Sequence, residues 1–388
     1  MTQARITRVR LENYKSIKFC DVKLEPITVL VGQNGSGKSN FLDALVFTRD
    51  LLLQNLDFAI QERGNFFEIA RKEGVQQAPS FSVLLEVTVG QECLALYYQI
   101  AFEEKPIIKE QYLKNEQGEY LYKIAENDIL INSIHLIEHL FTSHLGISVK
   151  SDSDVNVKGL VNVFLLLLQF LNPIPEHMRP PQNPNFFNWF KADGSNMDSV
   201  YQKLEQGQAQ KVRKIKHYLG LVNPDIIDIE VNNVSNYLLV DFLGKSSRFN
   251  KSAASDGTLS AWALITALFY CDDLKNSKLL ADTGCILILE EPEAHLYPTA
   301  LEILLILIRQ VVPTVQILLS THSPVLLEKI ELASGKEKIL VVETFNGETI
   351  IDEIDTASRN VVHKKLFDLG ELLTMNQLEP KAIAGKAR

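Results

Sequence analysis

Cysteine is scarce in this chain, and its spacing excludes two kinds of site. The four cysteines lie far apart and form no CxxC pair; they are Cys20, Cys93, Cys271 and Cys285. Disulfide frameworks and structural zinc sites depend on closely spaced or regularly spaced cysteines. We therefore expect free thiols, no metal held by cysteine, and a reducing, cytoplasmic compartment.

The chain also lacks an apolar run long enough to cross a membrane. The two strongest runs, GLVNVFLLLLQFL and ALEILLILIRQVV, are shorter than the ~20 residues of a membrane span, and the second contains Glu302 and Arg309. We expect both runs to be buried helices. The first residues, MTQARITRVRLENYKSI, alternate charged with apolar residues, so we expect neither a signal peptide nor a membrane partner.

Positive charge is in the minority, with 39 Lys and Arg against 48 Asp and Glu. This balance excludes a surface coated for indiscriminate nucleic-acid binding, but it leaves one basic groove possible. The stretch QKVRKIKHYLGL places Lys211, Lys214 and His217 about one helical turn apart, with Arg213 and Lys216 beside them. Two interpretations stay open: a solvated helix face, which we favour, and a contact with the backbone of DNA or RNA.

The length of 388 residues allows two domains, or one large domain with an insertion. Alternating apolar residues predict strands in 5–31 and an antiparallel sheet in 81–124. From 127 to 221 the period becomes helical, interrupted by NPIPEHMRPPQNPN, whose prolines we expect to exclude regular structure. We divide the chain into a first part of the core (1–126), a helical insertion with a proline-rich loop (127–224) and a second part of the core (225–388).

A glycine-rich loop links an apolar strand to a helix in ITVLVGQNGSGKSNFLDAL. Its core, GQNGSGKS, matches the phosphate-binding pattern GxxxxGK[ST]. The glycines let successive N–H groups point at phosphate oxygens, and the helix start adds its positive dipole end. Lys38 would reach the β- and γ-phosphates, and the Ser39 hydroxyl would ligate Mg²⁺. The predicted nucleotide-binding residues are Gly32, Gln33, Asn34, Gly35, Ser36, Gly37, Lys38, Ser39 and Asn40.

Two other apolar strands end in residues suited to hydrolysis. In CILILEEPEAHLYP, Glu290 and Glu291 follow a buried strand, at the end where an α/β sheet presents its ligands. Because adjacent strand residues face opposite ways, Glu290 would hold Mg²⁺ through water and Glu291 would polarise the attacking water. In QILLSTHSP, His322 follows another strand and would hydrogen-bond the γ-phosphate or that water. On its own, His322 is better explained as a structural histidine, but beside the other two strand ends we favour the functional role.

The segment SDGTLS precedes a long apolar helix, and by itself it is a good N-cap region. The order of all these motifs resembles that of ABC-type ATPases in the branch that includes RecF, SMC and OLD proteins. RLENYKSIKFCDVKLEPITVLVGQNGSGKSN resembles their N-terminal sheet and Walker A motif, and SDGTLSAWALITAL resembles a variant ABC signature. ILILEEPEAHLYP resembles Walker B and the D-loop, and LLSTHSP resembles the switch-histidine loop.

The resemblance implies an α/β fold: an ABC-type P-loop NTPase head with a mixed sheet core, an N-terminal antiparallel sheet and a helical insertion. It implies an ATPase that uses ATP and Mg²⁺. Two copies would close head to tail on ATP, with Ser255, Asp256 and Gly257 of one copy facing the phosphates of the other. The chain is also similar to standalone ATPases of bacterial anti-phage and toxin–antitoxin loci, which implies a separate effector protein, or DNA or RNA, that reads the motion.

The sequence departs from the family pattern at two points. Glu290 stands where the wider family usually has Asp, although EEPEAHL resembles OLD proteins, and the glutamine loop is left open among Gln54, Gln61 and Gln76. OLD nucleases carry a Toprim domain after the histidine motif. Only about 65 residues follow His322 here, too few for an independent domain, so we expect no nuclease activity in this chain.

Other functions remain as alternatives. The chief one is a nucleotide-sensing scaffold that binds ATP, hydrolyses it little, and controls a neighbouring nuclease or toxin. The large insertion and the SDGTLS variant disfavour a transporter subunit, and a hexameric AAA+ motor fits less well still. The insertion lacks long heptad repeats, so we expect no extended coiled coil.

Overall fold

The computed structural model describes the chain in nine stretches, and a central sheet organises them. The stretches are 4–53, 55–73, 76–89, 92–125, 128–131, 168–184, 190–235, 237–274 and 285–384. Within them the strands form sheets of six, seven, three and two strands.

The six-stranded sheet carries the predicted site. Its strands in spatial order are β11 (Leu168–Leu171), β15 (Cys285–Glu290), β16 (Val315–Thr321), β3 (Ile27–Val31), β17 (Glu337–Phe345) and β18 (Glu348–Glu353). Neighbours run parallel from β11 to β17, and β18 is antiparallel to β17. The C-terminal ends of β11, β15, β16 and β3 therefore meet at one edge, where sheets of this kind bind ligands.

The two faces of this sheet line two separate hydrophobic cores. All of β3 is buried; Val29 and Val31 pack in one core and Leu30 in the other. β15 divides in the same way, with Leu287 in the first core and Ile288 in the second. A strand covered on both faces needs a continuous apolar sequence, which is why ITVLV and CILIL do not alternate.

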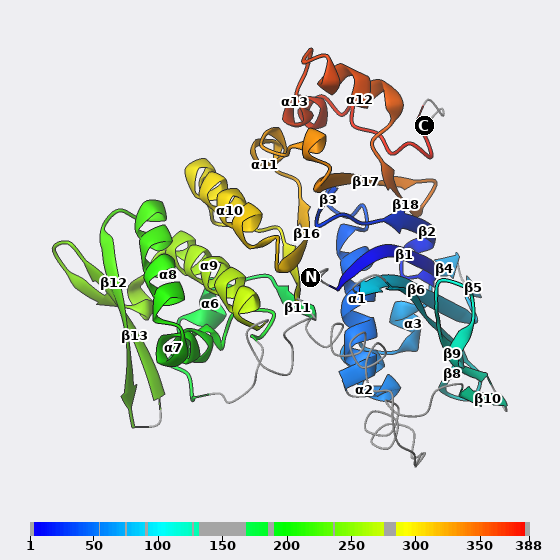
Figure 1. The fold of residues 1–388 in the computed structure, drawn as a ribbon, viewed down its shortest axis with the longest axis horizontal. Coiled ribbons are helices and arrows are strands. Elements are labelled where there is room, and N and C mark those ends of the chain that lie inside the picture. The colour runs from blue at the N-terminus through cyan, green and yellow to red at the C-terminus, as the bar shows by residue number, and fades with distance from the viewer. Residues whose placement is uncertain are drawn as a thin grey trace.

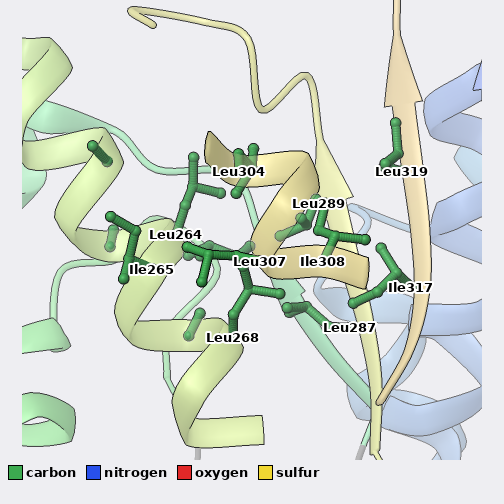
Figure 2. Packing of buried hydrophobic residues seen from close by; sticks show 14 of the residues in the cluster. Leu264, Ile265, Leu268, Leu287, Leu289, Leu304, Leu307, Ile308, Ile317 and Leu319 are labelled. Atoms are coloured by element: carbon green, nitrogen blue, oxygen red, sulfur yellow. The ribbon is translucent and has the colours of Figure 1, made fainter. Parts of the chain in front are cut away.

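Helices α9 (Asp256–Leu274) and α10 (Pro298–Val311) cover the first face. Figure 2 shows their contact with the sheet: Leu264, Ile265 and Leu268 of α9 and Leu304, Leu307 and Ile308 of α10 gather beside Leu287, Leu289, Ile317 and Leu319 of β15 and β16. Burying a side chain of this size contributes about 1.5–3 kcal/mol, so the α9 packing fixes the helix firmly against the sheet.

Helix α1 (Lys38–Leu53) covers the second face together with the seven-stranded sheet. Tyr14, Phe47 and Phe81 join the two through ring centroids 5.4, 5.5 and 6.0 Å apart. The predicted antiparallel block is confirmed. The sheet order is β10 (Asp128–Ile131), β9 (Tyr120–Ala125), β8 (Pro106–Lys114), β7 (Glu92–Phe102), β6 (Ser80–Val89), β1 (Arg5–Tyr14) and β2 (Ile17–Lys23). Between α1 and β6 lie α2 (Leu56–Gln61), α3 (Phe66–Ile69), β4 (Lys72–Glu73) and β5 (Gln76–Gln77).

A lobe packs on the outer side of α9. It consists of α6 (Pro175–Met178), α7 (Met197–Gly207), α8 (Ala209–Val222), β12 (Ile226–Val234), β13 (Tyr237–Gly244), β14 (Arg248–Asn250) and the 3₁₀ turn η1 (Lys251–Ala253). Figure 1 shows this lobe and α1 on opposite sides of β16. The predicted return of strands after position 225 is confirmed by β12 and β13.

The C-terminal part of the chain joins the same hydrophobic core as α9 and α10. It comprises α11 (Pro324–Glu328), η2 (Leu332–Ser334), α12 (Thr356–His363) and α13 (Leu369–Thr374). Figure 1 shows α11, α12 and α13 grouped beyond β17. Among the helices of the described stretches, none combines the length and the apolar character of a membrane span.

Three predictions about the insertion are wrong. Its first described residues are not helical, because Asp128–Ile131 is strand β10, which pairs with β9 in the seven-stranded sheet. The end of GLVNVFLLLLQFL is not a helix: Leu168–Leu171 is a strand of the central sheet, because a short apolar run fits a buried strand as well as a buried helix. The proline-rich segment does form one turn of helix, α6, with Pro175 at its start, where a missing N–H costs nothing. The domain boundaries at 126 and 224 stay a prediction, and residues 132–167 lie outside the described stretches.

Candidate functional site

The glycine loop lies between the end of β3 and the start of α1, and two of its glycines have a left-handed backbone. Gly35 and Gly37 have φ of 78° and 105°, which favour glycine. A Cβ at Gly37 would lie 2.2 Å from Thr349 Oγ1, and one at Gly32 would lie 2.0 Å from the Val342 carbonyl oxygen. The loop therefore fits tightly against β17 and β18, and its shape depends on those contacts.

A chain of hydrogen bonds braces the loop from behind. The Asn40 amide donates to Ser16 Oγ at 2.7 Å, and Ser16 Oγ lies 2.7 Å from Thr349 Oγ1. Thr349 Oγ1 in turn donates to the carbonyl oxygen of Ser36 at 2.8 Å. Because these residues come from α1, the β1–β2 turn and β18, the loop is tied to three elements.

Lys38 is 4% exposed, and its ammonium donates to the carbonyl oxygens of Gly32 at 2.8 Å and Gln33 at 3.0 Å. Burial lowers the pKa of Lys38, whereas the negative charges of Glu291, Glu293 and Glu290 act to raise it. The carboxylates favour the charged form of Lys38, and an ammonium at this place can donate hydrogen bonds to phosphate oxygens. Ser39 is exposed at the start of α1, on the same edge of the sheet.

The two predicted carboxylates face different partners. Glu290 accepts a hydrogen bond from the Asn172 amide at 3.4 Å, and Glu291 Oε1 lies 3.6 Å from His322 Nδ1. The change of direction comes from Glu291, whose φ of 43° turns the chain sharply as β15 ends. Its N–H donates to the Ser320 carbonyl oxygen at 3.1 Å, which holds the turn against the end of β16. The structure thus brings Glu290, Glu291 and His322 together.

Asn172 is a candidate residue that the sequence analysis missed. It directly follows β11, the strand beside β15, so its amide reaches Glu290. Three glutamines were left open as the residue of the glutamine loop. Gln61 ends α2 and is exposed, while Gln54 and the Gln76 side chain lie outside the described residues. The polar residue and proline after an apolar run, as in LQFLNP, repeat the pattern of the β15 end and would have revealed Asn172.

The predicted signature residues begin α9 in the lobe. Ser255 caps the helix, since its Oγ accepts from the Thr258 N–H at 3.2 Å, which confirms the N-cap prediction. Arg179 donates to Asp256 Oδ1 at 2.6 Å and to the Ala254 carbonyl oxygen at 3.0 Å. Gly257 lies against the D-loop of its own chain, because a Cβ there would be 2.7 Å from the His295 carbonyl oxygen.

Two cavities flank the glycine loop. One of about 320 Å³ lies between the loop, β17 and the residues after α13, and the Gln33 amide crosses it to Asn376 Oδ1 at 2.9 Å. The other, of about 750 Å³, lies beside Asn40 and is lined by charged groups of both signs, including Lys15, Asp43 and Arg71. Both adjoin the segment predicted to hold the phosphates.

A metal held by protein side chains alone is not indicated. Within the described stretches, no three histidine, cysteine or acidic side chains converge in a way that could hold a metal ion. Mg²⁺ in phosphate sites needs only one or two protein ligands, since phosphates and water complete its octahedron. The Ser39 hydroxyl and the half-buried Glu290 carboxylate fit that requirement. Their roles, like those of the other site residues, stay predictions.

The basic helix α8 resembles a solvated face more than a nucleic-acid contact. Arg213, Lys214 and His217 are exposed. Lys211 pairs with Asp272 at 2.9 Å, and Lys216 pairs with Asp228. Two of the five basic groups are thus neutralised by the chain itself, which is the interpretation we favoured.

The sequence matches two ATPase families in adjacent parts. Residues 5–157 match the family described as "AAA ATPase domain", and residues 166–328 match the family described as "AAA domain, putative AbiEii toxin, Type IV TA system". Together the two matches span most of the chain, from β1 to α11. No curated protein matches the sequence.

The fold is similar to SMC head domains of known structure. One, an SMC head bound to the C-winged helix domain of ScpA, has 14% identity and a TM-score of 0.58 over 91% of this chain and 99% of that one. Another, an SMC head with an extended coiled coil bound to the C-terminal domain of ScpA from Pyrococcus furiosus, has 12% identity and a TM-score of 0.52 over 94% and 100%. This likeness confirms the predicted fold class, an ABC-type P-loop head.

Proposed function

Since the sequence matches AAA ATPase families in two parts and the fold is similar to SMC heads, we propose that the chain is an ATPase of the ABC type, in the RecF and SMC branch, that acts as an ATP-driven dimerisation switch. Two copies would close head to tail on ATP. The segment from Ser255 to Gly257 of each copy would then face the phosphates held by the other. Hydrolysis in the shared sites would release the pair.

One observation carries this proposal: the predicted residues fall into two groups. Lys38, Glu290, Glu291 and His322 meet at one edge of the central sheet. Ser255 is exposed at the start of α9, and its side chain is hydrogen-bonded to Thr258 of the same helix. An exposed helix start is a good partner for an anion, and a second copy supplies one if its phosphates are bound.

Within each site the residues divide the chemistry. Lys38 would hold the β- and γ-phosphates, and Ser39 and Glu290 would hold Mg²⁺, which supplies positive charge at the phosphates when bound. Glu291 would accept a proton from the attacking water, while His322 would hydrogen-bond that water or the γ-phosphate. The larger cavity beside Asn40 would receive the base and ribose, because its charged lining can pair with their polar groups.

We further propose that a separate effector reads the dimer, in anti-phage defence or in DNA repair and maintenance. The description of the matched family names a type IV toxin–antitoxin system, and the similar SMC heads are bound to domains of ScpA. Both similarities support a partner protein that binds one state of the dimer and responds to it. The cysteine thiols suit the reducing cytoplasm.

The test uses the Glu291→Gln variant beside the wild type. A glutamine cannot accept the proton, so turnover should fall by about 10²–10⁴-fold while ATP affinity is kept, and the ATP-bound dimer should persist. Light scattering would measure the dimer with ATP and Mg²⁺, and the Glu290→Gln variant should weaken binding only when Mg²⁺ is present. A Glu291→Gln protein that hydrolyses ATP at the wild-type rate would remove Glu291 from this role.

A further inference from the structure

Glu293 is a third carboxylate at the hydrolysis site, and none of the sequence motifs assigned it a role. It follows Glu290 and Glu291 in the turn after β15, and its side chain is 9% exposed. Its Oε1 accepts a hydrogen bond from Thr321 Oγ1 at 2.6 Å and another from the His322 N–H at 2.9 Å. Glu293 therefore fixes the backbone from which the histidine extends.

Glu293 Oε1 also lies near the His322 ring, where it competes with Glu291 to accept a hydrogen bond from Nδ1. His322 Nδ1 lies 3.5 Å from Glu293 Oε1 and 3.6 Å from Glu291 Oε1. Both separations are slightly too long for a full hydrogen bond, so the ring stands between two carboxylates and is committed to neither. A small rotation of the ring would pair Nδ1–H with one of them.

The second oxygen of Glu293 makes that competition unequal. Glu293 Oε2 is buried, and no donor within the described stretches reaches it. A buried carboxylate oxygen without a donor is costly, and hydrogen bonds to an ionised acceptor are the strong ones. Glu291 is four times as exposed, with a side chain 36% accessible, and can be solvated by water. The His322 ring, whose Nδ1 lies 3.5 Å from Oε1 of the same carboxylate, can donate to Glu293 after a small rotation.

We propose that Glu293 is a positioning residue that draws His322 away from Glu291, a role that rests on the proposed function of Glu291 as the base. When His322 Nδ1–H donates to Glu293, the Glu291 carboxylate is free to accept a proton from the attacking water. When His322 pairs with Glu291 instead, the base is occupied. Glu293 acts on the reaction only through the histidine.

The substitution Glu293→Gln separates this role from a structural one. The amide oxygen can still accept from Thr321 and from the His322 N–H, so the loop should keep its shape. A neutral amide is a weaker acceptor than a carboxylate, and the ring should move to Glu291. We expect kcat to fall about tenfold or more, with ATP affinity and melting temperature unchanged. Glu302→Gln is the matched control, since Glu302 is an exposed partner of Lys329 on α10.

A double-mutant cycle with His322→Ala tests whether the effect passes through the ring. Without an imidazole there is nothing to misplace, so adding Glu293→Gln to His322→Ala should change the single-turnover rate less than twofold. If the two losses multiply instead, Glu293 acts structurally and the proposal is wrong.

The same series separates this inference from the function on which it rests. If Glu291→Gln abolishes turnover while Glu293→Gln matches the wild type and the Glu302→Gln control, only the role of Glu293 fails. If Glu291→Gln itself turns over normally, the assignment of the base fails, whatever Glu293 does. Loss of turnover in Glu293→Gln together with a lowered melting temperature would also contradict the proposal.

Discussion

Glycines of the phosphate loop are constrained to very different degrees. Gly37 combines φ of 105° with a neighbour, Thr349, that would lie 2.2 Å from an added Cβ. Gly35 also has a positive φ, 78°, but nothing lies within 4 Å of the place where its Cβ would stand. A side chain at Gly35 would cost only backbone strain. A side chain at Gly37 would also collide with Thr349, so the loop would have to move away from β18.

This contrast predicts unequal effects of two alanine substitutions. Gly35→Ala costs the backbone strain of one left-handed residue, roughly 1–2 kcal/mol, and should weaken ATP binding at most moderately. Gly37→Ala should displace the loop, break the bond from Thr349 to Ser36, and reduce ATP affinity on the order of 100-fold. Titration with a fluorescent ATP analogue would compare them. Equal losses in the two variants would show that the Thr349 contact is unimportant.

The lobe contains one buried ion pair, between Lys251 and Asp198, each 2% exposed at the side chain. Burial raises the pKa of Asp198 from 3.8 to about 6, even though the Lys251 charge opposes the rise. The folded carboxyl thus holds its proton more tightly than the unfolded one. Its contribution to the free energy of unfolding is full below about pH 4 and is lost as pH rises through about 6.

The pH dependence of stability tests whether the contribution of Asp198 falls or rises with pH. The free energy of unfolding of the wild type, minus that of Asp198→Asn, should fall by up to about 3 kcal/mol between pH 4 and pH 7. Urea titrations at five pH values would measure the difference, and other acidic groups cancel because both proteins share them. A difference that grows with pH would mean that the ionised pair stabilises the lobe outright.

At the scale of elements, the segment after β11 joins the two halves of the site. It begins with Asn172, whose amide reaches Glu290, and after α6 it ends with Arg179, which binds Ala254 and Asp256 beside the signature. Eight residues, from Asn172 to Arg179, therefore connect Glu290, the proposed Mg²⁺ ligand, to the helix start that would face a partner. We infer that Arg179 sets the angle at which α9 presents Ser255.

Removing that link should affect turnover more than stability. The Arg179–Asp256 pair is partly exposed, so Arg179→Ala should change the free energy of unfolding by less than about 1 kcal/mol. ATP binding to the monomer should be unchanged, and turnover should fall on the order of tenfold, or about 1.4 kcal/mol in the transition state. Arg248→Ala, which removes a similarly exposed pair in the same lobe, is the control. Wild-type turnover in Arg179→Ala would exclude the link.

The central strands were predictable where an apolar run was bounded by turn residues. β3 precedes a glycine loop, and β15 and β16 end in charged or polar residues followed by proline, so their type and their functional tips could be read from the sequence. β11 has the same polar-then-proline ending, but its four residues close a longer apolar run that was interpreted as a helix, so the strand was missed. Asn172 was missed with it, since its meaning depends on the strand beside β15.

Contacts between distant segments were not predictable. Nothing local indicates that Thr349 would brace a loop more than 300 positions earlier, or that Glu293 would hold Thr321 and His322. Such contacts follow from strand order: β17 lies beside β3, and β15 lies beside β16. Periodicity gives the strands but not their neighbours, so it identified the residues of the site without giving their partners.

At the scale of the whole molecule, the two cores separate the glycine loop from the predicted signature segment. α1 and the glycine loop belong to one face of the central sheet, and α9 with the signature start belongs to the other (Figure 1). Each chain would therefore carry the proposed phosphate-binding half and the proposed signature half on opposite faces of one sheet. A head-to-tail pair would bring unlike halves together twice, giving two complete sites by symmetry.

Complementation between two inactive variants tests this sharing most directly. Lys38→Ala cannot hold the phosphates, and Ser255→Arg should bind ATP but put bulk and charge where the partner's γ-phosphate docks. Each should be inactive alone. A mixed pair has one site with both lesions and one with neither, so mixing should restore turnover, up to about a quarter of the wild-type rate if pairing is random and sites are independent. A covalently linked pair would control for weak closure. No turnover from that linked pair, or wild-type turnover by a protein that stays monomeric with ATP, would contradict the shared site.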